Sequence, residues 1–266
     1  MNRVVFGKVC FLFCAFLHFS ASAVTNGLVA YYPFNGNGND ESGNGLNGSV
    51  YGATPIADHL GNDTGAYYFD GINDRIDLPM ETLGFERTNA FSQSLWIKTT
   101  DTDTANNILA KNEFLGRDRG LNLVLARGFF RFQLISDNPI GDRLIVRTES
   151  LVNDGQWHHV VATYDGSSAA SGVKIYLDGV LANMVVGADA LVGPILNTIT
   201  PTIGARNSAF HYRGAIDEVR IYDRVLSDEE VAYLYSGGSA EMDVYSEALT
   251  NLVVVAGESE TRAITV

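Results

Sequence analysis

The chain has little cysteine and little basic charge. Its two cysteines, Cys10 and Cys14, both lie within the first 23 residues, which leaves the remainder without a disulfide framework or thiol chemistry. Lysine and arginine total 18 against 31 aspartate and glutamate residues, a formal net charge of −13 at pH 7. This acidic balance argues against nucleic acid and anionic membrane surfaces as partners and suits solubility outside the cell. It also supplies carboxylates for hard cations such as calcium.

Residues 1–23 have the pattern of a targeting segment. Arg3 and Lys8 give a positive start, an apolar run covers residues 9–19, and Ala21-Ser22-Ala23 is a small-residue cleavage site. The apolar run is too short to span a bilayer as a helix. We therefore predict a signal peptide and an exported protein, secreted or at the cell surface and of bacterial type, with no membrane insertion after signal removal.

Helical periodicity is nearly absent between the signal segment and Ser227, and short strand-like runs separated by turn signals take its place. About a dozen such runs predict an all-β fold, a jelly-roll sandwich of two antiparallel sheets packed face to face. Asp178-Gly179 between two apolar runs predicts a hairpin. The runs cover residues 28–34, 66–70, 75–78, 91–99, 107–111, 121–126, 129–135, 143–148, 158–164, 173–177, 180–186 and 215–222.

One short C-terminal helix is expected to close this fold. Ser227 and Glu230 have the spacing of a capping box, and two acids follow Ser227 in the first turn, where the helix dipole favours them. This predicts a helix over about residues 228–235. A Ser-Gly-Gly-Ser stretch then reads as a linker. We assign residues 24–236 to the jelly-roll domain and 237–266 to a linker and the start of a possible further β module, with an edge hairpin on the main domain as the alternative.

A carboxylate stands within the last strand-like run. Strand alternation places Asp217 on one face with Ala215, Val219 and Ile221. A carboxylate facing a core must be neutralised, hydrogen-bonded or bound to a metal, because an unpaired buried charge is too costly. Segment 35–52 is dense in glycine and asparagine and can wrap carbonyls around a cation, or serve as a flexible linker. Three ways to compensate the Asp217 charge therefore remain open: a calcium site, hydrogen bonds from backbone amides, and pairing with an arginine.

Six segments, in order, resemble the bacterial laminin-G-like domains of the concanavalin A-like lectin/glucanase superfamily. They are G-L-V-A-Y-Y-P-F-N-G-N-G-N-D-E-S-G-N-G at 27–45, A-Y-Y-F-D-G-I-N-D-R-I-D-L at 66–78, S-L-W-I-K at 94–98, Q-W-H-H-V-V-A-T-Y-D-G at 156–166, V-K-I-Y-L-D-G-V at 173–180, and the run from I-G-A-R to G-A-I-D-E-V-R-I-Y-D-R-V-L-S at 203–227. The resemblance implies a concanavalin A-like jelly roll whose members mostly bind glycans or mediate adhesion.

The same resemblance implies a structural calcium ion between the Gly/Asn loop and the last long strand. It carries the metal role to Asp40 and Asp217, with Asn44 and Asn47 as further oxygen donors in the loop. Calcium bound in this way would fasten the first and last segments of the fold. Chelation is then expected to lower thermal stability.

The loop that precedes Asp217 offers the best ligand contacts. Arg206, Asn207, Phe210 and Tyr212 combine aromatic faces, which suit sugar rings, with an amide and a guanidinium that hydrogen-bond hydroxyls or acids. The alternative is that Phe210 and Tyr212 only cap the sandwich edge. His158 and His159, being adjacent on a strand, point to opposite faces and cannot chelate one metal.

Catalytic motifs are missing from the sequence. Glycan-hydrolysing relatives need paired carboxylates, commonly as E-x-D-x-E on one strand, and no such triplet occurs. There is no nucleophile elbow, H-E-x-x-H or phosphate loop either. We therefore predict a non-enzymatic, calcium-stabilised carbohydrate-binding or adhesion module with a glycan or cell-surface partner. The alternatives are a glycoside hydrolase or lyase with an unrecognised carboxylate pair, and a structural spacer module of a larger surface protein.

Overall fold

The computed structural model describes residues 23–103, 105–113, 116–207 and 209–237. The signal peptide and the C-terminal linker and module predicted from the sequence lie almost wholly outside these residues. None of the helices in the described part of the chain is long and apolar enough to cross a membrane.

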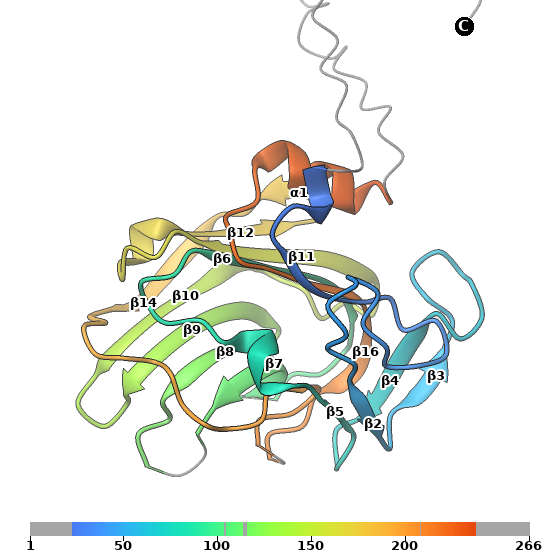
Figure 1. Ribbon diagram of the computed structural model, residues 1–266, viewed down its shortest axis with the longest axis horizontal. Coiled ribbons are helices and arrows are strands. Elements are labelled where there is room, and N and C mark those ends of the chain that lie inside the picture. The colour runs from blue at the N-terminus through green and yellow to red at the C-terminus, as the bar shows by residue number, and fades with distance from the viewer. Residues whose placement is uncertain (1–22, 104, 114–115, 208, 238–266) are drawn as a thin grey trace, which may run out of the picture.

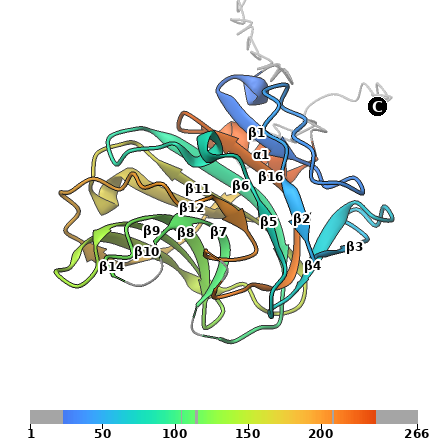
Figure 2. The same ribbon diagram turned by 60° about the horizontal axis from the view of Figure 1, so that its bottom comes forward.

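Two antiparallel sheets pack face to face, which confirms the predicted sandwich (Figures 1 and 2). Sheet A contains, in spatial order, β13 (Val180–Leu181), β12 (Val173–Leu177), β11 (Trp157–Tyr164), β6 (Phe91–Lys98), β16 (Arg213–Tyr222), β4 (Ala66–Asp70) and β3 (Thr54–Ile56), with β1 (Leu28–Tyr32) paired to β16. Sheet B contains β14 (Met184–Asp189), β10 (Asp142–Leu151), β9 (Phe129–Asp137), β8 (Gly120–Ala126), β7 (Asn106–Asn112), β15 (Thr202–Ile203), β5 (Arg75–Asp77) and β2 (Ser49–Tyr51). Short 3-10 turns occur at η1 (Ala23–Thr25), η2 (Met80–Leu83) and η3 (Ala170–Gly172).

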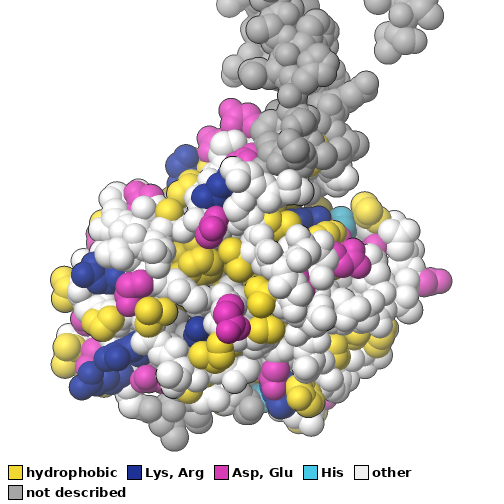
Figure 3. Space-filling model, viewed as in Figure 1, with side chains coloured by type: hydrophobic (Ala, Val, Ile, Leu, Met, Phe, Trp, Pro, Cys, Tyr) yellow, Lys and Arg dark blue, Asp and Glu magenta, His cyan; other side chains and the backbone are white. Residues whose placement is uncertain are grey.

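The core lies between the sheets because every second side chain of the central strands is apolar and buried. On β8 these side chains are Leu121, Leu123 and Leu125, and on β9 they include Phe130 and Phe132. Full burial of each such side chain contributes about 1.5–3 kcal/mol. On the surface shown in Figure 3, acidic and basic side chains are interspersed with apolar ones.

Strand β16 changes its alternation at Glu218. The pairing of β16 with β6 shifts register after Asp217, and Glu218 has a φ of +54°, which together mark a β-bulge. Ile216, Val219 and Ile221 consequently face the core, whereas Asp217 lies on the outer face of sheet A. The predicted common face of Asp217, Val219 and Ile221 is therefore wrong, because regular alternation does not hold across a bulge. The predicted burial of Asp217 is confirmed, at 1% exposure.

Helix α1 (Asp228–Tyr235) covers part of the outer face of sheet A (Figure 1). It begins with the predicted capping box: the Glu230 backbone N–H donates to the Ser227 hydroxyl, and the Ser227 N–H donates to the Glu230 carboxylate. Val231 and Leu234 pack against a small apolar cluster on β11, β12 and β16. The predicted hairpin between β12 and β13 is also present, with Asp178 and Gly179 both at positive φ.

Candidate functional site

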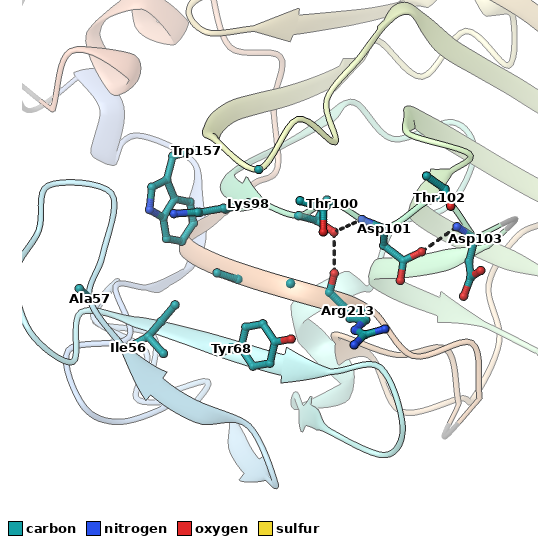
Figure 4. Close-up of a pocket in the computed structure, with 14 residues that line it drawn as sticks. Ile56, Ala57, Tyr68, Lys98, Thr100, Asp101, Thr102, Asp103, Trp157 and Arg213 are labelled. Carbon is teal, nitrogen blue, oxygen red and sulfur yellow. Dashed lines mark hydrogen bonds between the residues drawn. The ribbon is translucent and has the colours of Figure 1, made fainter.

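A pocket of about 610 Å³ opens on the outer face of sheet A (Figure 4). Strand β16 runs through it at Gly214 and Ala215, and the segment after β6 forms one wall. Trp157, at the start of β11, and Tyr68, on β4, lie on opposite sides of β16 in the close-up. The half-buried Trp157 and the 39% exposed Tyr68 therefore give this pocket two aromatic walls.

Small residues keep the floor of the pocket low. A Cβ atom on Gly214 would lie 2.4 Å from the carbonyl oxygen of Lys98 and 2.9 Å from the hydroxyl of Tyr212. Only glycine fits at such a close approach of two strands. On this floor β16 contributes Gly214 and the methyl group of Ala215, while its first residue, Arg213, belongs to the polar wall. A ligand ring can therefore approach the sheet backbone between the aromatic walls.

Hydrogen bonds fix the polar wall. The Thr99 hydroxyl donates to the Arg213 carbonyl at 2.6 Å and accepts the Asp101 N–H at 2.9 Å, while the Asp101 carboxylate accepts the Asp103 N–H at 2.7 Å. Lys98 and Arg213 are exposed at the pocket, and no ion pair of the described residues involves either of them. Their N–H groups can therefore donate to hydroxyls or acidic groups of a ligand.

His158 holds the segment that presents Trp157. Its Nδ1 lies 2.9 Å from Asp178 and its Nε2 lies 3.1 Å from Asp154. Burial lowers the pKa of His158, but the hydrogen bonds and charges of Asp178 and Asp154 outweigh it, so the net shift is upward. His158 and His159 face opposite ways as predicted, and His159 Nε2 lies 2.9 Å from the Ser94 hydroxyl on the outer face of sheet A.

His59 fastens the loop between β3 and β4 beside the pocket. Its Nδ1 lies 2.7 Å from the Asp217 carboxylate, its ring stacks on Trp96 at 4.1 Å, and it meets Trp157 edge-on at 6.4 Å. Burial raises the pKa of the Asp217 carboxyl group, although the hydrogen bond from His59 opposes this shift. Asp217 thus has a histidine partner, whereas the alternatives to calcium weighed from the sequence were backbone amides and an arginine.

The sequence did not point to this pocket. Trp157 and Lys98 were not among the predicted ligand contacts, and Arg213 directly follows the four predicted ligand residues without having been assigned to the site. Tyr68 is the pocket residue that the sequence could have indicated. It lies in a strand between Tyr67 and Phe69, which are buried, so alternation directs its own ring to the surface. A large exposed aromatic residue in the middle of a strand is worth considering as a binding residue.

The predicted ligand loop is arranged differently from the expectation. Tyr212 is fully buried in the core, so its ring is not available to a surface ligand, and the prediction that it contacts a ligand is wrong. Arg206 is ion-paired with Asp118 and lies over the Phe210 ring at 5.4 Å. Phe210, 43% exposed, and the exposed Asn207 remain accessible. None of the four predicted residues lines the pocket on sheet A.

Asp40 organises the Gly/Asn loop through hydrogen bonds. Its two carboxylate oxygens accept the N–H groups of Tyr31, Ser42 and Leu46 and the hydroxyl of Ser42, each at 2.9 Å. Burial raises the pKa of Asp40, but these donors outweigh it and the net shift is downward. The amide oxygen of Asn47 is also occupied, because it accepts the Asp40 N–H at 2.9 Å.

These residues do not fit the predicted calcium site. Asn44 turns its amide nitrogen to the carbonyls of β1. Asp217 contacts His59, and among the described residues no hydrogen bond joins Asp217 to Asp40. No group of three or more His, Cys, Asp or Glu side chains in the described part of the chain could hold a metal ion. Calcium needs six to eight oxygens around one point. Calcium binding therefore stays a prediction from the family resemblance alone.

Chelation by EDTA is expected to leave the melting temperature unchanged, because hydrogen bonds already satisfy the Asp40 carboxylate. Thermal unfolding would be followed by circular dichroism, with EDTA presaturated with calcium as the control. A fall in the melting temperature that added calcium reverses would contradict this expectation and restore the calcium site.

The comparisons with known proteins agree with this fold. Residues 69–232, more than half of the chain, match the laminin G-like family model of the concanavalin A-like lectin/glucanases superfamily. The chain therefore belongs to this superfamily, as the sequence resemblance predicted. No curated protein matches the sequence.

Several solved structures share the architecture. The binding domain of Paraclostridial Mosquitocidal Protein 1 aligns with a TM-score of 0.62 and 18% identity over 80% of this chain and 53% of that one. The botulinum neurotoxin DC binding domain, solved with rat synaptotagmin II, aligns with a TM-score of 0.62 and 14% identity over 82% of this chain and 53% of that one. Domain 4 of AbnA, a GH43 extracellular arabinanase from Geobacillus stearothermophilus, was solved with arabinotriose. It aligns with a TM-score of 0.57 and 23% identity over 78% of this chain and 98% of that one. This chain thus spans about half the length of the toxin domains, and at these identities the likeness establishes the fold.

Proposed function

We propose that this protein is an exported, non-catalytic module that binds a glycan in the pocket between Trp157 and Tyr68. The observation that carries the proposal is the combination of two aromatic walls, a glycine floor and the cations Lys98 and Arg213 in one pocket. Aromatic faces pack against the C–H faces of sugars, and a few convergent polar groups fix the orientation of the ligand. The arabinotriose complex of a domain with the same architecture supports a glycan as the ligand.

Two observations support a module without catalytic activity. A glycoside hydrolase needs a carboxyl group of raised pKa beside the scissile bond and a second carboxylate across from it. Asp217 has the raised pKa, but it is 1% exposed beneath His59 and does not line the pocket. Asp101 and Asp103 line the pocket, but they stand on the same wall rather than across from each other, and the Asp101 carboxylate accepts the Asp103 N–H. Incubation with polysaccharides is therefore expected to produce no new reducing ends.

Export is supported by the signal-like pattern of residues 1–23 and by the acidic composition. A glycan partner at the cell surface or in the extracellular matrix follows from this location. Calcium is left out of the proposal, because the loop oxygens of Asp40 and Asn47 do not fit it. A spacer module without a ligand is the remaining alternative, and it predicts a blank glycan array.

Trp157→Ala and Tyr68→Ala are each expected to weaken glycan binding by about 1.5–2 kcal/mol, roughly 10–30-fold in Kd, because each removes one aromatic wall. A glycan array would supply the ligand, and isothermal titration calorimetry would measure the affinities. Tyr51→Ala is the matched control, since Tyr51 is an exposed tyrosine on sheet B and should bind as the wild type does. Unchanged binding in both pocket variants would place the site elsewhere.

A further inference from the structure

Three arginines lie together on sheet B without a carboxylate partner. Arg131 on β9 pairs directly opposite Arg147 on β10, and Arg127 lies in the turn before β9 at a φ of +55°. No ion pair in the described part of the chain involves any of the three. Like charges directly opposite each other in a sheet are destabilising, and this cluster occurs in a chain with a net charge of −13.

The cluster faces away from the core. Phe130 and Phe132, which flank Arg131, belong to the core between the sheets, and so does Val146, which precedes Arg147. Alternation therefore directs Arg131 and Arg147 to the outer face of sheet B. The pocket proposed for glycan binding lies on the outer face of sheet A, so Arg131 and Arg147 lie on the opposite side of the sandwich. The turn that carries Arg127 reaches the edge of that pocket, because the Arg127 N–H donates to the carbonyl of the pocket residue Asp103 at 2.7 Å.

The arginines are held in place but are not satisfied. The Arg131 Nε is buried and has no hydrogen-bond partner among the described residues. Burial, followed by the charges of Arg147 and Arg127, lowers the pKa of the Arg131 guanidinium, and no carboxylate counters this shift. The Arg147 guanidinium stacks over the Phe129 ring at 4.3 Å and donates one hydrogen bond to the Thr148 carbonyl. The unmet donors and the mutual repulsion destabilise the isolated fold, and a bound anion would relieve both.

Amide side chains continue the same face next to the arginines. Gln133 lies two residues along β9 from Arg131 and pairs with Asn122 on β8. The amide nitrogen of Asn122 donates to Asn107 at 2.8 Å, while its amide oxygen is buried without a partner in the described ranges. Amides beside a cationic cluster suit a ligand that carries hydroxyl groups together with an acidic group.

We propose that Arg127, Arg131 and Arg147 form a second binding site, which takes the carboxylate or sulfate group of an anionic polysaccharide. Guanidinium groups bind such oxyanions with paired, charge-assisted hydrogen bonds. The ring of Phe129 beneath Arg147 gives the adjoining sugar an apolar edge to pack against. This site is additional to the pocket on sheet A and does not depend on it.

Titration calorimetry at fixed ionic strength tests this site with dextran sulfate, polygalacturonate and neutral dextran of matched length. The wild type is expected to bind at least one of the two anionic polymers and not dextran. Comparison of dextran sulfate with polygalacturonate shows whether the site recognises sulfate or carboxylate groups. Arg131→Met and Arg147→Met should each weaken that binding by about tenfold and should raise the melting temperature, because each removes one of two opposed charges. Replacement of an arginine with a purely structural role would instead lower the melting temperature. Arg147→Lys, which keeps the charge without the planar fork, should fall between the wild type and Arg147→Met.

Lys174→Met is the matched control, because Lys174 is an exposed cation on sheet A that is paired with Asp228, and its binding should equal that of the wild type. The proposal is overturned if neither anionic polymer binds, if dextran binds equally well, or if Lys174→Met weakens binding as much as the arginine variants. Equal binding of duplex DNA would also overturn it, since that would show unspecific attraction to polyanions. If one methionine variant fails to fold, the other and Arg147→Lys decide the outcome.

Discussion

Replacement of His59 by leucine is expected to destabilise the protein by about 3 kcal/mol at pH 7, because removal of one partner leaves a buried charge uncompensated. Asp217 is 1% exposed, and one of its oxygens has no other partner among the described residues. His59 also stacks between the sheet and the pocket, on Trp96 and against Trp157. Its loss should therefore loosen the loop between β3 and β4 as well as the fold.

The pH dependence of this loss has a definite sign. Burial raises the pKa of Asp217 above its ordinary value of 3.8, the nearby Glu218 and Asp58 raise it further, and His59 opposes them. A carboxyl group with a raised folded pKa contributes stability that is complete below its unfolded pKa and is lost as pH rises through its folded pKa. Without His59 the folded pKa of Asp217 rises further. The penalty in His59→Leu should therefore be larger at pH 7 than near pH 4.

Urea unfolding of His59→Leu and of the double variant His59→Leu/Asp217→Asn would measure this effect at both pH values. The double variant has no titrating carboxyl group at position 217, so it should be the more stable at pH 7, and the difference should shrink toward pH 4. Equal stability of the two variants at every pH would show that Asp217 carries no buried charge, contrary to this account.

Tyr212→Ala is expected to lower the free energy of unfolding by about 3–5 kcal/mol, the usual range when a large aromatic side chain is removed from a core. Tyr212 is fully buried, packs against Phe69 with ring centroids 6.4 Å apart, and supports Gly214 in the pocket floor. Chemical denaturation would measure the loss. Any effect on glycan binding should follow from unfolding, not from a lost ligand contact.

Two variants separate the core role of Tyr212 from a role at the surface. Tyr212→Phe should cost less than about 1 kcal/mol, because the hydroxyl hydrogen bonds to Lys98 and Ala215 are long, at 3.5 Å. Phe210→Ala, at a 43% exposed position, should also have a small effect on stability. A stable Tyr212→Ala protein that has lost only glycan binding would instead support the loop at residues 206–213 as the binding site.

Much of the fold could be predicted because its strands carry local signals. Each predicted strand-like run overlaps an observed strand, and the hairpin and the capped helix are where turn and capping residues placed them. The single run predicted at 180–186 is wrong, because it divides into β13 in sheet A and the start of β14 in sheet B. The two-residue strand β15 and the short β3 were missed, because such lengths give alternation no room to show. The bulge at Glu218 was also missed, because a non-glycine residue at positive φ leaves no mark in the strand pattern.

The site was harder to predict, because its contacts join distant parts of the chain. Burial of Asp217 followed from the strand pattern, but its partner lies 158 residues away, in a loop with no motif. Asp40 lies beside β1, the strand that pairs with β16, yet its oxygens are taken by backbone N–H groups that the sequence could not orient. The pocket arises where β3, β4, β6, β11 and β16 meet. That meeting point depends on sheet order, which single-strand patterns do not encode.

The most direct measurement of the central claim is a titration of the ¹⁵N-labelled protein with the glycan selected on the array, followed by NMR at the tryptophan side chains. The protein has two tryptophans: Trp157 forms a wall of the pocket, and Trp96 is packed beneath His59 and Tyr235. The account predicts a large, saturable shift of the Trp157 indole signal, with backbone shifts at Lys98 and Gly214. An unmoved Trp157 signal at saturation, with shifts confined to residues 206–212 or to sheet B, would contradict it.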